Sequence, residues 1–144
     1  MPIRPENRDR YPADWPQISQ RIRQRAGWRC EWCGIENGRL GGRSQSGRWW
    51  DAGPLDCSGR RPRPGETWWC YNEEIGTSML LPIVRIVLTV AHIHDPSPEN
   101  CAEENLAALC QRCHLNHDRK HHLAVQAELR HRAMATPDLF RGAA

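Results

Sequence analysis

The sequence has 144 residues and a mass of 16.6 kDa, which corresponds to a single domain. Its hydrophobic content of 39%, charged content of 26% and mean hydropathy of −0.75 exclude a membrane-spanning protein. The longest apolar stretch, 79–91, is interrupted by Pro82 and Arg85 and is too short for a span. Because no apolar run follows residues 1–4, we expect no secretory signal, and therefore a cytoplasmic protein.

Charged and aromatic residues are distributed unevenly along the chain. Residues 1–70 contain 13 basic and 8 acidic side chains, a net charge of +5, whereas residues 71–144 contain 7 and 9, a net charge of −2. Every cation except Lys120 is an arginine, whose rigid guanidinium suits phosphate groups and favours a polyanionic partner. All seven tryptophans precede residue 70 and all seven histidines follow residue 91, which indicates that the two halves have different roles.

The first half of the chain begins with a Pro- and Arg-rich arm over residues 1–13, which we expect to be extended. A helix is expected next, with Asp14 as its N-terminal cap and Gly27 at its end. Residues 30–34 are typical of a tight knuckle. Residues 38–70 are rich in Gly, Arg, Pro and Trp without periodicity, and we predict an irregular insertion there.

The second half begins with a β-branched run over residues 83–90, which predicts a strand that reaches His94 and is bent or in two pieces. Residues 95–100 predict a loop. A second knuckle follows, and a helix is expected from about Gln111 to about Ala135.

Four of the seven cysteines form two Cys-x-x-Cys pairs, Cys30/Cys33 and Cys110/Cys113, which are separated by 76 residues. The odd number of cysteines in a reducing compartment does not indicate a disulfide framework. Two such pairs can complete a tetrahedron around Zn²⁺ with Zn–S bonds of about 2.3 Å, which leaves no open position. We therefore predict a structural zinc, which can contribute on the order of 10 kcal/mol to folding. The alternatives are a redox dithiol, against which the lack of a βαβ context around either pair argues, and two unrelated thiol pairs.

The other three cysteines are Cys57, Cys70 and Cys101. We interpret them as free thiols. A second metal site that uses Cys57, Cys70 and a third ligand stays open as an alternative.

His92 lies at the end of the predicted strand, Asn105 follows the loop, and Cys110-x-x-Cys113-His114 opens the helix. This order resembles the HNH (His-Me finger, ββα-metal) nucleases, whose signature His, Asn and His fall on His92, Asn105 and His114. The resemblance extends to residues 5–34, which look like the start of small HNH proteins common in phage and prophage genomes. The stretches that carry it are Pro5-Glu6-Asn7-Arg8, Tyr11-Pro12, Asp14-Trp15 and Arg29-Cys30-Glu31-Trp32-Cys33-Gly34.

The resemblance implies one α+β domain over residues 1–144, in which a ββα-metal nuclease element is stapled by the four-cysteine zinc site. The expected segments are an extended arm (1–13), a helix with the first zinc knuckle (14–34), an irregular Gly/Arg/Trp-rich insertion (38–82), the ββα-metal core (83–121) and a C-terminal helix and tail (122–144).

The resemblance also implies a metal-dependent endonuclease that hydrolyses phosphodiester bonds in DNA and leaves 5′-phosphate and 3′-hydroxyl ends. His92 would be the general base, since a histidine with an ordinary pKa near 6.5 is mostly neutral at pH 7.5. Asn105 would hold the loop and orient the base. His114, held in place by the neighbouring zinc thiolate, would bind one catalytic divalent ion, so that the structural and catalytic metals are different ions.

The chain departs from the commonest form of the motif at Ala91, where an acidic metal ligand usually precedes the first histidine. We therefore expect the catalytic ion to be bound by His114 first, then by His94 and His117. Such an imidazole site would accept Mn²⁺ or Ni²⁺ as well as Mg²⁺. The alternative is that Ala91 marks a zinc-stabilised binding or phage accessory module that retains the nuclease fold without cleavage.

Two tryptophan doublets, Trp49-Trp50 and Trp68-Trp69, lie beside arginines in the predicted insertion. They are typical either of a platform on which bases stack or of the apolar contacts of the insertion itself. The arginines of the first helix likewise indicate either a phosphate-facing surface or an ordinary charged face. Our candidate nucleic-acid-binding residues are Arg21, Arg25, Arg48, Arg60 and Arg61.

DNA is the expected partner, at low sequence specificity, because nothing resembles a dedicated recognition helix for the major groove. Phage packaging proteins are a further candidate partner. We expect a monomer or a weak dimer in a bacterial or phage-infected cell, with no membrane association.

Overall fold

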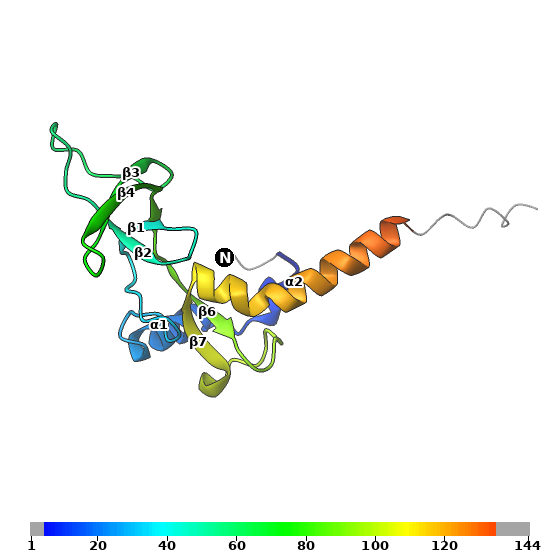
Figure 1. Cartoon of the computed structure of the whole chain (residues 1–144). Helices are drawn as coiled ribbons and strands as arrows, with labels where there is room; N and C mark the ends of the chain where they lie inside the picture. The colour runs from blue at the N-terminus through cyan, green and yellow to red at the C-terminus, as the bar shows by residue number, and fades with distance from the viewer. Residues whose placement is uncertain (1–4, 135–144) are drawn as a thin grey trace, which may run out of the picture.

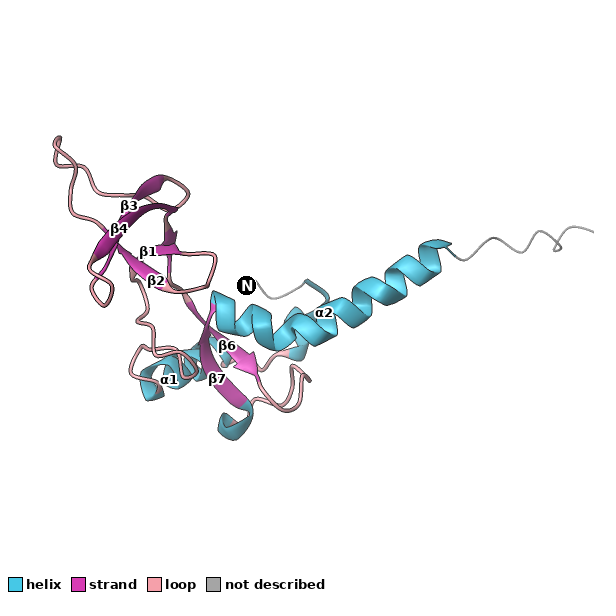
Figure 2. Cartoon of the chain, in the orientation of Figure 1, coloured by secondary structure: helices cyan, strands magenta, loops and turns pink. Residues whose placement is uncertain are grey.

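The structure is a computed structural model that describes residues 5–134, except for the side chains of residues 5, 6, 120–122, 125, 133 and 134. The tail that was predicted to follow the last helix lies outside the described residues. The chain forms two groups of antiparallel strands and two α-helices (Figures 1 and 2). The mixed α+β class expected from the sequence is therefore confirmed. Among the described residues, no helix combines the length and the apolar character needed to cross a bilayer.

The first residues described are not extended, so the prediction of an extended arm is wrong there. A 3₁₀ helix, η1, spans Pro5–Arg10. The Arg10 guanidinium donates to both carboxylate oxygens of Glu99, at 2.7 and 3.1 Å. This bidentate pair ties the N-terminal segment to the loop that precedes η2 (Glu103–Asn105).

The first long element, α1, spans Trp15–Arg25 and begins close to where the sequence predicts it. Asp14 occupies the N-cap position, but its side chain makes no capping hydrogen bond. One face of α1 places Ile18 and Ile22 against buried Leu106 and other apolar residues of the second strand group. Gly27 follows the helix with a φ of +60°, a conformation that glycine adopts without a steric penalty.

Residues 38–82 contain four strands, so the prediction of an irregular insertion is wrong apart from the loop over 53–66. A five-stranded antiparallel sheet has the order β4-β3-β2-β1-β5. Its strands are β1 (Leu40–Arg43), β2 (Trp49–Ala52), β3 (Thr67–Asn72), β4 (Thr77–Pro82) and β5 (Val84–Arg85). β1 and β2 have only four residues each, and β3 and β4 have consecutive apolar residues, so no alternating pattern stands out in the sequence.

The five-stranded sheet curls on itself around a small core of Trp50, Cys70, Leu81 and Ile83. β4 and β5 follow each other directly along the chain, and they pair with β3 and with β1 respectively. The bent 77–85 segment therefore joins the two sides of the sheet, and β1 packs against β4. Gly42 permits this close approach, because a Cβ atom at position 42 would overlap the Cβ of Leu81.

The second strand group is a two-stranded antiparallel pair of β6 (Leu88–His92) and β7 (Leu106–Cys110). The expectation of two pieces is confirmed by β5 and β6, but the second strand ends at His92 and not at His94. Every residue of β7 is buried. Its two faces alternate: Leu106 and Ala108 contact the α1 side, whereas Ala107 and Leu109 belong to a core cluster on the opposite side.

The last helix, α2 (Gln111–Met134), begins directly after β7, as predicted, and projects beyond the rest of the molecule (Figure 1). Its first residues connect the two strand groups. Arg112 donates to the carbonyl of Gly47 in the β1–β2 turn at 2.6 Å, and Gln111 donates to the carbonyl of Arg85 at 2.8 Å. The five-stranded sheet is therefore held against the start of α2.

The close approach of β1 to β4 generates a stability prediction. We expect Gly42→Ala to lower the free energy of unfolding by about 1–3 kcal/mol, because the added methyl group overlaps Leu81 and forces the strands apart. Chemical denaturation measures the change, with Gln45→Ala at an exposed turn position as the control. Equal stability of Gly42→Ala and the wild type would contradict the curled sheet.

Candidate metal centre and histidine site

Two segments far apart in the sequence bring the four cysteines of the predicted zinc site together. Cys30 and Cys33 lie in the turn after α1, and Cys110 and Cys113 lie at the junction of β7 and α2. Their four sulfur atoms all lie within 4.8 Å of one another. The first knuckle is also paired with β7, because the Glu31 N–H donates to the carbonyl of Ala108 at 2.9 Å.

The geometry of this four-cysteine cluster fits a tetrahedral metal. The sulfur atoms of Cys33 and Cys110 are 3.7 Å apart. A tetrahedron with Zn–S bonds of about 2.3 Å has edges of about 3.8 Å. A disulfide would place the two sulfur atoms about 2.05 Å apart, so this pair is not bonded. The four cysteines can therefore hold a structural metal such as zinc.

The thiols of this cluster have perturbed pKa values. Burial raises the pKa of Cys30, but backbone N–H groups of Cys110, Cys33 and Trp32 outweigh it and bring the pKa to about 7. Burial raises the pKa of Cys33 and Cys113, and for Cys113 the neighbouring thiols raise it further. Four clustered thiolates therefore need a cation to balance their negative charge. A divalent metal would provide that charge and would displace the thiol protons on binding.

The remaining cysteines do not form a second metal site. Cys70 is buried in the core of the five-stranded sheet, and burial raises its pKa. Cys57 is exposed in the loop after β2, and the Cys101 thiol donates to the carbonyl of Pro98 at 3.2 Å. In the described part of the chain, only the four-cysteine cluster gathers three or more metal-binding side chains.

Asn105 holds the loop that connects β6 to β7. Its side chain is buried, at 3% exposure. The side-chain oxygen accepts hydrogen bonds from the backbone N–H groups of His94 and Asp95, at 3.0 and 2.9 Å. The side-chain nitrogen donates to the carbonyls of Asp95 and Asn100, both at 2.9 Å. All four hydrogen bonds reach across the loop, so Asn105 sets the backbone conformation directly after His92.

His92 lies at the end of β6 and is half-buried between aromatic rings. Its imidazole is stacked on Trp15, with ring centroids 5.8 Å apart and planes at 11°, and Tyr11 packs against it edge-on at 5.9 Å. Burial lowers the pKa of His92, and the nearby His114 lowers it further, although Asp95 opposes the shift. Nε2 is buried and has no hydrogen-bond partner in the described part of the chain. This environment favours the neutral imidazole.

His114, in the first turn of α2, contacts a carboxylate that the sequence reasoning missed. Its Nδ1 lies 2.7 Å from the hydroxyl oxygen of Thr89, and its Nε2 lies 3.3 Å from Oδ2 of Asp118. His117 Nδ1 lies 3.0 Å from the other Asp118 oxygen. Asp118 therefore lies between two of the predicted metal ligands. The i, i+4 spacing from His114 is the signal that could have identified it.

The third candidate ligand, His94, is exposed and is not part of this His–Asp group. The side chain of Ala91 is 1% exposed and belongs to the core cluster with Cys30 and Cys110. The position that commonly carries an acidic ligand therefore has a buried methyl group.

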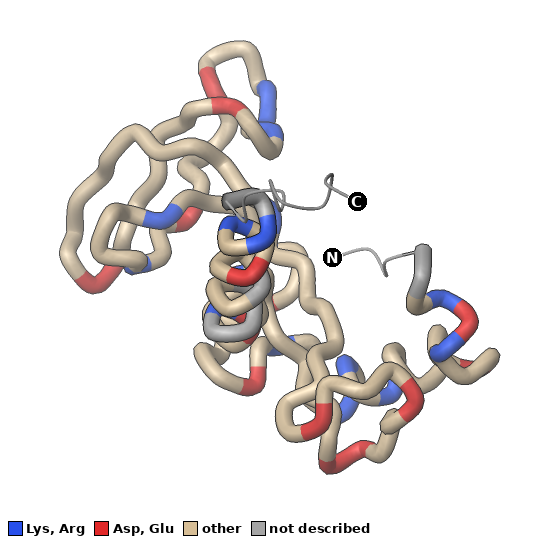
Figure 3. The backbone as a smooth tube through the Cα atoms, turned by 90° about the vertical axis from the view of Figure 1, so that its right-hand side faces the viewer, with Lys and Arg blue, Asp and Glu red and all other residues tan. Residues whose placement is uncertain are grey.

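The candidate nucleic-acid-binding arginines are mostly engaged within the protein. Arg25 donates to the carbonyls of Leu106 and Glu103 and pairs with Glu31, so it has a structural role. The other pairings are Arg21 with Glu103 at 3.7 Å, Arg48 with Glu74 at 3.9 Å, and Arg60 with Asp56 and Glu66. Arg61 is exposed and forms no ion pair among the described residues. Acidic positions are interspersed among the basic ones over the backbone (Figure 3).

Each tryptophan doublet has one more buried and one more accessible member. Trp50 lies in the core of the five-stranded sheet, and Trp49 is half-buried with the guanidinium of Arg43 at 5.3 Å from its ring. Trp68 is half-buried beneath Arg60, and Trp69 is 59% exposed. The apolar interpretation therefore describes Trp50, whereas Trp69 is accessible for a contact outside the protein.

Comparison with known proteins does not identify a family. No protein-family model matches the chain, and no significant match is found among curated proteins or solved structures.

The cysteine geometry predicts one tightly bound zinc per chain. We expect Cys33→Ser to lower the zinc content and to reduce the melting temperature, because a metal-linked contribution on the order of 10 kcal/mol is weakened. Elemental analysis and thermal denaturation measure the two effects. Cys57→Ser, also at an exposed cysteine, is the matched control and leaves both unchanged. A metal-free wild type with full stability would contradict the site.

Proposed function

We propose that this protein is a metal-dependent endonuclease of the HNH type that hydrolyses phosphodiester bonds in DNA. The observation that carries the proposal is the arrangement of three side chains around one β-hairpin and its helix. His92 ends β6, Asn105 fixes the following loop by four hydrogen bonds, and His114 directly follows the four-cysteine cluster on α2. This arrangement supports the order of elements that the resemblance implies.

The environment of His92 suits a general base. Hydrolysis needs a group that accepts the proton of the attacking water, and a base must be unprotonated to do so. Burial lowers the pKa of His92, which favours its neutral form, and Asn105 fixes the backbone of the loop that follows it. The two aromatic contacts, with Trp15 and Tyr11, orient the imidazole ring. The hydrogen bonds to the Asn105 side chain hold the backbone of the loop.

The residues that would hold a divalent ion are His114 and Asp118, with His117 beside them. An imidazole and a carboxylate one helical turn apart are a donor pair that Mg²⁺, Mn²⁺ or Ni²⁺ accepts. Such an ion would stabilise negative charge on the phosphoryl group and on the leaving oxygen. Because Ala91 offers no ligand, this site has fewer protein donors than the commonest form of the motif, and we propose that water and phosphate oxygens complete the coordination.

Buried Ala91 also favours a second candidate function, a zinc-stabilised DNA-binding module or phage packaging accessory without cleavage. Such a module would need the four-cysteine cluster and the exposed arginines, but not a neutral His92. Replacement of His92 separates the two functions, because it should abolish cleavage by an endonuclease but leave DNA binding by a binding module unchanged.

The test is conversion of supercoiled plasmid in the presence of Mg²⁺, Mn²⁺ or Ni²⁺. We expect the wild type to nick the plasmid, and we expect His92→Ala to lower the rate by at least about 100-fold, the usual contribution of a general base. His131→Ala, at an exposed position near the end of α2, is the matched control and keeps full activity.

The outcomes separate the candidates. Equal nicking by His92→Ala and the wild type would contradict the assignment of the base. DNA binding without nicking in any of the three metals would contradict the endonuclease and favour the binding module.

A further inference from the structure

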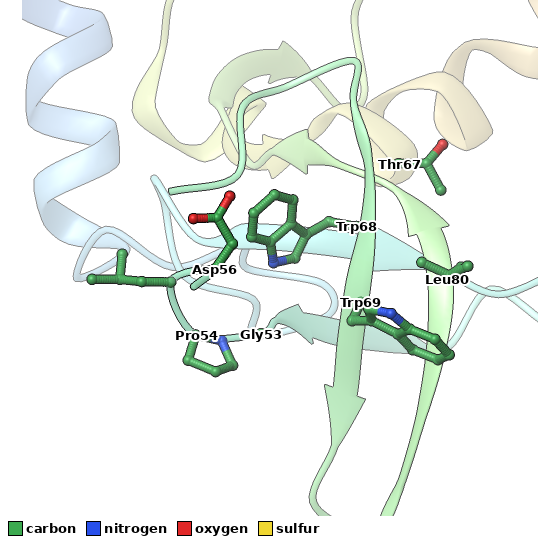
Figure 4. Close-up of a pocket in the computed structure, with 8 residues that line it drawn as sticks. Gly53, Pro54, Asp56, Thr67, Trp68, Trp69 and Leu80 are labelled. Carbon is green, nitrogen blue, oxygen red and sulfur yellow. The ribbon is translucent and has the colours of Figure 1, made fainter. Parts of the chain in front are cut away.

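A cavity of about 320 Å³ lies on the five-stranded sheet, in a different part of the chain from the histidine site. The loop after β2 forms one wall with Gly53, Pro54, Leu55 and Asp56, while β3 and β4 form the other. Figure 4 shows Asp56 beside Trp68, and Trp69 beside Leu80 on the neighbouring strand. The backbone N–H of Gly53 donates to the carbonyl of Trp69 at 2.7 Å, which fixes the loop against β3.

The lining of this cavity is aromatic and open to solvent. Trp69 is 59% exposed, and its cross-strand neighbour Leu80 is 53% exposed. Exposed apolar side chains that adjoin a cavity of this kind mark a ligand-binding surface. The indole N–H groups of Trp68 and Trp69 donate to no protein atom among the described residues.

The charges around the cavity favour an anionic ligand with a planar ring. The Arg60 guanidinium lies 5.0 Å from the Trp68 ring centroid and pairs with both Asp56 and Glu66. Arg61 and Arg63 follow in the same loop; both are exposed, and neither forms an ion pair among the described residues. Within the loop over residues 53–66, three arginines and two carboxylates therefore leave a net charge of +1 next to the cavity.

We propose that this cavity binds an unpaired nucleotide of the DNA substrate, with the base stacked on Trp69 and its phosphates next to Arg61 and Arg63. The inference rests on the proposed action on DNA. An indole face combined with cations that follow the backbone is how proteins hold single strands, because every base has a π-face. Bases inside a duplex are already stacked and do not reach such a cavity. The preferred substrate is therefore DNA with a single-stranded segment.

The experiment measures binding rather than cleavage. Fluorescence anisotropy reports the affinity of zinc-loaded protein for a short labelled single-stranded DNA, for its duplex and for an RNA of the same sequence, without added Mg²⁺ or Mn²⁺. We expect the single-stranded DNA to bind more tightly than the duplex. Trp69→Ala lowers the affinity for single-stranded DNA by about 5- to 150-fold, the factor that one base–aromatic stack provides. Trp69→Phe, which keeps a ring, retains more of the affinity.

Tyr71→Ala is the matched control. Tyr71 lies two residues further along β3, is exposed on the same face and does not line the cavity. We expect its loss to leave the affinity unchanged. Arg61→Gln should lower the salt dependence of binding, because one phosphate contact is lost.

Three results would overturn the proposal: equal affinity of Trp69→Ala and the wild type, preference for the duplex or the RNA, or binding of a proline-rich peptide at this cavity in place of DNA. Failure of the endonuclease proposal gives a different pattern. In that case, the plasmid is not nicked, whereas the loss of single-strand binding in Trp69→Ala persists.

Discussion

The four-cysteine cluster is the constraint on which the rest of the structure depends. It joins the turn after α1 to the point where β7 becomes α2, and these segments are 76 residues apart in the sequence. Cys30 and Cys110 are also members of the main core cluster, with the strand residues Leu88, Ala91 and Leu109. Metal binding and apolar packing therefore act on the same residues. Metal loss would loosen the strand pair and the start of α2 together.

The same coupling extends to the first turn of α2. His114 follows Cys113 directly, so a metal held by the cysteines would fix the first turn of α2 and the His114–Asp118 pair. His92 is fixed by different means, through the Asn105 hydrogen bonds and the stack on Trp15. The five-stranded sheet attaches to the same helix start through Arg112 and Gly47. We propose that the sheet presents DNA while the hairpin and α2 carry the chemistry.

The sequence was sufficient to predict those parts of the site that depend only on residue type and on spacing along the chain. Two Cys-x-x-Cys pairs predict a shared metal because thiolates need a cation wherever they meet, and Asn105 was expected to hold a loop, which it does. The sheet over residues 38–82 was missed because β1 and β2 have only four residues each, and because β3 and β4 carry apolar side chains at consecutive positions rather than in alternation. Asp118 was missed because histidines were favoured as ligands. No local pattern indicates that Trp15 stacks on His92, since that contact arises from tertiary packing.

The central claim is that a structural metal and a catalytic metal are separate ions on one chain. The most direct measurement is the rate of plasmid nicking as Mn²⁺ is added to dialysed protein, with the zinc content followed in the same samples. The account predicts that zinc stays at one ion per chain while the rate rises from zero and saturates with Mn²⁺. A rate that is already maximal without added metal and falls in proportion to zinc removal would contradict it, because one ion would then serve both purposes.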